Sequence, residues 1–178
     1  MNRKFFLPVV AALLASATSA HAQGAAPAQP APAPFKRNWA PPAYRIKAQV
    51  LVDAMMAEHP ELLGLTLHGA PPGMTDYTMF AASYHDRIGK VSGPDDVMAS
   101  AIGRIMIETS YKPGDNKAVV LVPLKDAAGR VVATAVFGFH DNNWDNKSAP
   151  YYAGAAMSLA EGLSRHIASH DDLFARAE

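Results

Sequence analysis

The amino-acid sequence predicts an α+β domain in which an antiparallel five-stranded sheet is covered by an N-terminal helix, an internal helix and a C-terminal helix. Three stretches repeat apolar residues at helical spacing. Five others alternate apolar and polar residues or form β-branched apolar runs, which is typical of strands. Consecutive predicted strands are joined by short turns, and such connections favour antiparallel pairing. These patterns extend over about 135 residues, which is enough for one domain with its own core.

The first 22 residues have the pattern of a secretory signal peptide. Arg3 and Lys4 precede an apolar run at residues 5–14, which is too short to cross a bilayer. Small residues follow and end in a cleavage pattern at residues 20–22. We therefore expect cleavage near Ala22 and a periplasmic or secreted mature protein.

An Ala/Pro-rich linker is predicted for residues 23–40, because alternating Ala and Pro favour an extended polyproline conformation and cannot build a core. The ligand-binding domain is then expected at residues 41–172. Without Arg3 and Lys4, 14 basic residues remain beside 16 acidic ones, and no basic stripe is present. Nucleic acid is therefore not expected as a partner. The chain has no cysteine, which excludes thiolate metal sites and cysteine nucleophiles.

The first half of the domain is predicted to contain a helix followed by two strands. Apolar residues recur at helical spacing in residues 41–58, where Pro41 suits a helix start. Residues 63–68 alternate as a strand, and residues 77–84 form a second strand after the stretch HGAPPGM. The face of the first strand toward the covering helix is expected to carry Leu63, Leu65 and Leu67.

A second helix is expected after residue 91. Ser92 is the predicted cap, with Asp95 as the reciprocal acid and Pro94 in the first turn. The buried face of this helix is expected to consist of Val97, Met98, Ala101, Ile102 and Ile105.

Three strands and a last helix complete the domain. The strands are predicted at residues 107–111, 117–124 and 130–140, and a tight turn with Gly129 at positive φ joins the last two. Ser148 is expected to cap the last helix, which runs to about His170.

This order of elements, together with the stretch VVLVPLKDAAGRVVATAVFGF, resembles the PAS-like fold of single Cache domains, the extracytoplasmic sensor modules of bacteria. The resemblance covers about residues 41–170 and implies a module that binds a small molecule. The stretches HGAPPG, RIGK and DD also resemble small secreted bacterial proteins of unknown role, which implies a free-standing domain. Amino-acid-binding Cache domains carry an arginine followed by an aromatic pair and a late aspartate in the final strand. Here Ile-Gly-Lys follows Arg87 and Gly138 takes the late position, so that binding mode is not expected.

Six residues are predicted to bind a small anionic organic ligand, with no catalytic residue among them: His68, Tyr77, Tyr84, Arg87, Lys90 and Asp96. Arg87 and Lys90 lie three residues apart in one loop and could grip a carboxylate. The alternative is a solvated loop whose charges pair locally. His68 is expected on the cupped side of the sheet near the two tyrosines, or else as a core histidine bonded to a turn amide.

Haem or metal handling by the histidines is the alternative function. His166 and His170 are four residues apart, which would place both on one face of the last helix. No enzyme motif such as G-x-S-x-G or a P-loop is present, so a non-catalytic role is favoured. A small molecule is the expected partner, with a membrane receptor or transporter component and a second copy of the chain as further candidates.

Overall fold

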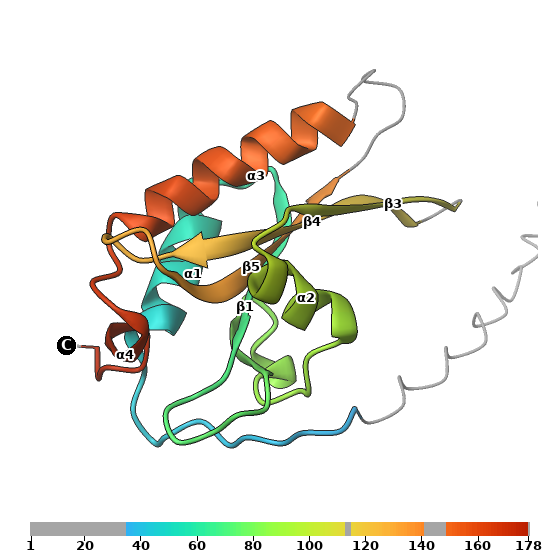
Figure 1. Cartoon of the computed structure of the whole chain (residues 1–178). Coiled ribbons are helices and arrows are strands. Elements are labelled where there is room, and N and C mark those ends of the chain that lie inside the picture. Colours follow the sequence, from blue (N-terminus) through green and yellow to red (C-terminus); the bar gives the residue numbers. More distant parts are fainter. Residues whose placement is uncertain (1–34, 113–114, 141–148, 178) are drawn as a thin grey trace, which may run out of the picture. The chain divides into compact units, whose positions relative to one another are not determined.

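Five antiparallel strands form a single sheet with helices on both of its faces (Figure 1). The computed structural model describes residues 35–112, 115–140 and 149–177, so the predicted signal peptide and most of the predicted linker lie outside the described residues. The strand order is β2-β1-β5-β4-β3. The elements are α1 (Lys47–Glu58), β1 (Leu62–Gly69), β2 (Thr78–Ala82), η1 (His85–Arg87), α2 (Pro94–Ile102), β3 (Met106–Lys112), β4 (Asp115–Lys125), β5 (Val131–His140), α3 (Ala149–Ser164) and α4 (His170–Leu173). The predicted α+β class with an antiparallel five-stranded sheet is confirmed.

One face of the sheet carries the apolar core beneath α1 and α3. On this face Leu65 pairs with Phe137 and Leu67 with Ala135, and all four side chains are buried. A bulge between Leu62 and Gly64 shifts the register at the start of β1. As a result Leu62, rather than the predicted Leu63, lies in the core. The helices supply the remaining buried apolar groups, including Val52, Met55, Tyr152, Ala156 and Leu163.

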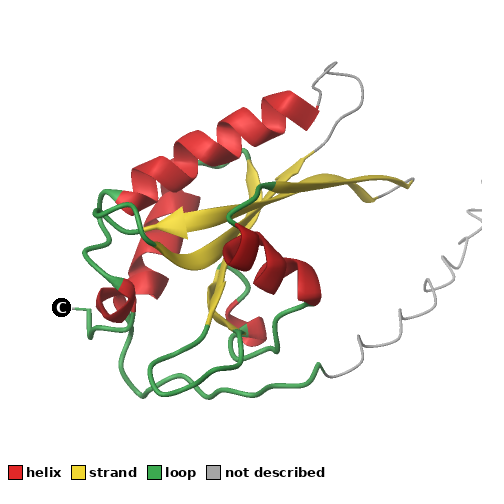
Figure 2. Cartoon of the chain, in the orientation of Figure 1, coloured by secondary structure: helices red, strands yellow, loops and turns green. Residues whose placement is uncertain are grey.

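The opposite face is covered by α2 (Figure 2). Several of its buried residues are polar. Thr66 and His68 of β1 lie on this face because they alternate with the core leucines. Thr134 is paired with His68 across β1 and β5 and is fully buried. Helices therefore cover both faces, but with different chemistry on the two sides.

The orientation of α2 differs from the prediction. Val97, Met98 and Ile102 are exposed, the last two to 45% and 52%, while Ala99 and Ser100 are the buried residues of the helix. Because the sheet offers hydroxyl and imidazole groups here, the small and polar face of α2 turns inward. Four residues of the predicted face thus point to solvent, namely Val97, Met98, Ala101 and Ile102, whereas Ile105 lies beyond the end of the helix and packs against the core.

The starts of the first two helices also differ from the prediction. No residue between 41 and 46 is helical, and Ile46 is extended, since it bridges Arg176 and the N–H of Lys47 donates to Ala175 O at 2.9 Å. Pro41 therefore does not begin α1. The N-cap of α2 is Gly93 rather than Ser92, and its N–H donates to Asp96 Oδ2 at 2.7 Å.

The last helix is shorter than predicted. α3 ends at Ser164, a turn brings the N–H of Ile167 to Ser164 O, and Ser169 caps the separate helix α4. His166 and His170 are therefore not on one helical face, and Nε2 of His170 lies 2.8 Å from Ala70 O. The predicted cap Ser148 lies outside the described residues. The β4–β5 turn is as predicted, with Gly129 at φ 81°.

Part of the segment predicted as linker belongs to the folded domain. The N–H of Asn38 donates to Gly89 O at 3.1 Å, and Arg37 bridges Lys90. The ring of Trp39 packs edge-on against Phe174, 6.3 Å between centroids. The domain therefore includes residues 35–40, because strand-like backbone contacts and an aromatic contact hold them.

Candidate functional site

A buried histidine lies at the centre of the polar contact between α2 and the sheet. His68 is 4% exposed. Its Nε2 is 2.9 Å from Thr66 Oγ1, and its Nδ1 is 2.9 Å from Ser92 Oγ and 3.2 Å from Asp96 Oδ2. β1 supplies His68 and Thr66, the loop before α2 supplies Ser92, and the first turn of α2 supplies Asp96.

The partners of His68 define its protonation state. Because a carboxylate can only accept a hydrogen bond, we assign the ring proton to Nδ1, which faces Asp96 and Ser92, and Nε2 then accepts from the hydroxyl of Thr66. Burial lowers the pKa of His68 to about 3, and the positive charge of Lys90 acts in the same direction. The ring is therefore neutral near pH 7.

The environment of Asp96 disfavours the charged form of its side chain. Burial raises its pKa, and the charge of Asp95 acts in the same direction. The N–H of Gly93 and the charge of Lys90 lower the pKa again without cancelling the shift. The carboxylate of Asp96 thus lies beside the His68 ring, accepts from the Gly93 amide and feels the positive charge of Lys90.

The rest of the α2 contact is also made through hydrogen bonds. The hydroxyl of Thr134 donates to Asp96 O at 2.6 Å and contacts the hydroxyl of Ser100. Since the buried residues of α2 are Ala99 and Ser100, the helix itself would expose few apolar atoms if it left the sheet. This makes α2 a candidate for low-energy local opening.

The structure brings together three of the six predicted site residues: His68, Lys90 and Asp96. Tyr77 supports the same cluster through its backbone, because its carbonyl accepts from the N–H of Ser92 at 3.2 Å. Thr66, Ser92 and Thr134 were missed. Strand alternation places Thr66 on the face of His68, but Thr134 becomes its neighbour only through the β1–β5 register.

The remaining two predicted residues lie elsewhere. The hydroxyl of Tyr84 donates to Leu63 O at 2.8 Å, and a Cβ on Gly64 would come within 2.7 Å of its ring. Gly64 is four residues from His68, which corresponds to about 13 Å along a strand. The Arg87 guanidinium lies 5.1 Å from the ring centre of Tyr84. The Arg87 side chain thus lies against Tyr84, whereas the charge of Lys90 acts on His68 and Asp96, and a joint grip of Arg87 and Lys90 on a ligand stays a prediction.

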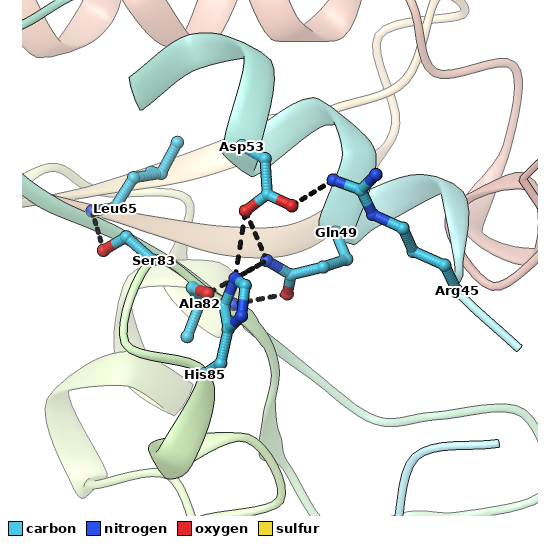
Figure 3. A network of polar contacts seen from close by, with 7 residues as sticks. All are labelled: Arg45, Gln49, Asp53, Leu65, Ala82, Ser83 and His85. Carbon is cyan, nitrogen blue, oxygen red and sulfur yellow. Dashed lines mark hydrogen bonds and ion pairs between the residues drawn. The ribbon is translucent and has the colours of Figure 1, made fainter. Parts of the chain in front are cut away.

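A second polar network, which the sequence did not indicate as functional, joins α1 to the outer strand β2 (Figure 3). The side-chain amide of Gln49 donates to Ala82 O and accepts from Ala82 N–H, both at 3.0 Å. The same amide donates to Asp53 Oδ1 at 2.8 Å, and Asp53 also contacts Arg45 and His85. Burial opposes ionisation of Asp53, but hydrogen bonds from these neighbours together lower its pKa. We assign this network to stability, because Gln49 satisfies the outer backbone groups of Ala82 on the edge strand β2.

An open groove of about 880 Å³ lies away from the His68 cluster. It runs between α3 and the end of β4, and its lining includes none of the six predicted site residues. The groove and the polar cluster are therefore separate features of the domain.

The histidines do not form a metal site in the described parts of the chain. No group of three or more His, Cys, Asp or Glu side chains gathers there in a suitable arrangement. None of the helices within residues 35–177 that are described is both long and apolar enough to cross a bilayer.

The fold and the cluster define an α+β domain with one helix fastened to its sheet by a buried polar contact. No protein-family model matches the chain, and no curated protein matches it in sequence. Among solved structures, it is similar to a transcriptional regulator of the IclR family from Rhodococcus sp., with 16% sequence identity and a TM-score of 0.40. The match covers 72% of this chain and 64% of that chain, so this chain spans less than two thirds of the regulator.

Proposed function

We propose that the protein is a non-catalytic, sensor-type module that binds a small organic carboxylate between α2 and the sheet. The carrying observation is that Nδ1 of His68 lies 3.2 Å from Asp96 Oδ2, to which the N–H of Gly93 donates at 2.7 Å, with the charge of Lys90 acting on the same carboxylate. A ligand carboxylate that took the place of Asp96 would meet the same donors. In the free protein, the carboxylate of Asp96 occupies the position that the ligand carboxylate would take.

The PAS-like, Cache-type identity is part of this proposal. It is supported by the strand order β2-β1-β5-β4-β3, by the helix over one face, and by the D-x-x-G turn between β4 and β5. Placement in the periplasm or outside the cell is supported by the pattern of residues 1–22. A membrane receptor or transporter component is the partner class that would read the state of α2.

Ligand entry requires α2 to move, and the contacts of α2 make this feasible. The helix buries Ala99 and Ser100 alone. Its polar contacts with the sheet include the hydrogen bonds of Thr134 to Asp96 O and to Ser100, which a polar ligand and water can replace. Binding would thus exchange one carboxylate for another and free α2 to report occupancy.

The test is calorimetric and thermal titration with acetate, lactate, succinate and benzoate. Asp96→Asn removes the competing charge while keeping the shape, and we expect about tenfold tighter binding of the preferred carboxylate. Lys90→Met should weaken binding. Asp95→Asn is the matched control, because Asp95 is the exposed neighbour in the same helical turn.

A preferred carboxylate at one hundred times its Kd should stabilise the fold by about 2.7 kcal/mol. If folded wild-type protein and Asp96→Asn both bind none of the carboxylates, the proposal is wrong. Equal effects of Asp96→Asn and Asp95→Asn would also contradict it.

A further inference from the structure

The groove beside α3 has walls formed by three segments of the chain. One stripe of α3 forms the first wall, the end of β4 with the β4–β5 turn forms the second, and the connection before β3 forms the third. β3 pairs with β4 only as far as Met106 opposite Leu121. Beyond that point, residues 122–125 of β4 have no described strand on this edge, and the groove lies beside them.

The walls are mainly apolar. Ile105, Val122 and Pro123 contribute from the β-strand side, and Met157 and Ala160 contribute from α3. Its volume lies within the range of sites that hold small organic molecules. An apolar portion of a ligand would therefore be removed from water here.

The charged groups of the groove leave one positive charge uncompensated. Asp126 is bound by Arg130 at 2.7 Å, and Glu161 is bound by Arg165 at 3.1 Å. Lys125 lines the groove too, and within the described chain it has no ion-pair partner. The groove therefore combines apolar walls with one cation, Lys125, whose charge is not matched by an ion pair, and this combination complements an amphipathic anion.

Gly154 gives a second, independent observation. It lies inside α3 and lines the groove, and a Cβ built on it meets no atom within 4 Å. Apart from proline, glycine is the least favourable residue inside a helix, so packing within the chain does not explain it. The missing side chain widens the groove.

We propose that this groove is a binding site for an amphipathic monoanion, with the hydrocarbon chain along α3 at Gly154 and Met157 and the anionic head at Lys125. The site is distinct from the carboxylate site at His68 and does not depend on it. A medium-chain fatty acid has the required chemistry.

The experiment titrates the full chain with decanoate below its micelle concentration, and in parallel with decyltrimethylammonium and acetate. Gly154→Ala places a methyl group in the groove and should weaken decanoate binding at least about fivefold while stabilising the helix. Gly162→Ala is the matched control, because Gly162 lies in the same helix with equal free space and does not line the groove. Lys125→Met should weaken binding about threefold, and Lys90→Met should have no effect.

Decanoate binding that responds to Gly154→Ala and not to Gly162→Ala supports the site. Equal decanoate affinity in the two glycine variants overturns it, as does equal binding of the cationic amphiphile. A dimer in light scattering that Gly154→Ala dissociates would assign the groove to a second copy of the chain and also overturn it. Loss of decanoate binding in Lys90→Met would place the fatty acid at the His68 site instead.

Discussion

The neutral, buried state of His68 predicts a specific loss of stability in mild acid. Its pKa is lowered from 6.5 to about 3 in the folded protein. As pH falls below 6.5, the unfolded chain takes up a proton that the folded chain cannot, so the free energy of unfolding decreases by about 1.4 kcal/mol per pH unit. Between about pH 7.5 and pH 5 this amounts to about 2 kcal/mol.

Two carboxyl groups, Asp96 and Asp53, also change the pH dependence of stability. Asp96 has a raised pKa, so the folded protein binds its proton first, and this adds stability as pH falls. It offsets part of the His68 effect, and Asp96→Asn should therefore show a steeper loss than the wild type. Asp53 has a lowered pKa, and its contribution is lost only as pH falls through and below the usual carboxylate range.

The assay is urea unfolding followed by circular dichroism at several pH values between about 7.5 and 5. Wild-type protein should lose about 2 kcal/mol more than His68→Gln over this interval, because the contribution of Asp96 is common to both proteins and cancels in the difference. His166→Gln, at an exposed position, is the control and should keep the wild-type slope. Equal pH slopes for His68→Gln and the wild type, both in the Asp96→Asn background, would refute the assignment of a neutral buried His68.

Three further predictions concern the helices. Gln49→Ala leaves the N–H and C=O of Ala82 without their partners, so urea unfolding should show that the free energy of unfolding falls by about 3 kcal/mol. Glu58→Ala on the same helix is the control and should cost almost nothing. A small effect of Gln49→Ala would contradict its role at the sheet edge. Thr134→Val should speed hydrogen exchange in α2 and leave the β4–β5 amides protected, and uniform loss of protection would argue against α2 opening as a unit. Ile102→Ser should cost less than about 0.5 kcal/mol, because the side chain faces solvent, whereas a cost above about 2 kcal/mol would mean that α2 packs with its apolar face inward.

The strands and the β4–β5 turn could be predicted because their signals are local. The alternation around Leu65 and Leu67 marks a core face whatever covers it, and a D-x-x-G turn specifies positive φ at Gly129. The bulge at the start of β1 could not be predicted in this way, because it depends on pairing with β5, more than seventy residues later in the chain. The exchange of Leu63 for Leu62 in the core follows from that pairing.

The orientation of α2 could not be predicted from its own sequence. Val97, Met98 and Ile102 form an apolar stripe, which normally indicates the buried side. The sheet beneath carries Thr134, which bonds to α2 across 34 and 38 residues of sequence. These distant hydroxyl groups select the polar side of the helix, and no local pattern reveals them.

Only part of the candidate site could be predicted, because some of its contacts also depend on residues far apart in the sequence. His68 and Asp96 could be placed on one side of the sheet by alternation and by the position of the helix start. Arg87 was grouped with Lys90 by spacing alone, but the N–H of Lys90 donates to Arg87 O in a tight turn, and the Arg87 side chain goes to Tyr84. The cap was displaced from Ser92 because His68 takes the Ser92 hydroxyl.

Nitrogen NMR of the His68 ring tests the central proposal most directly. In the free protein near pH 7, Nδ1 should show the signal of a protonated nitrogen in a neutral ring, and Nε2 that of a hydrogen-bond acceptor. Saturating addition of the preferred small carboxylate should keep the ring neutral, shift the Nδ1–H resonance and release the α2 amides to faster exchange. Binding of that carboxylate with no change at Nδ1 and no change in α2 would contradict the account.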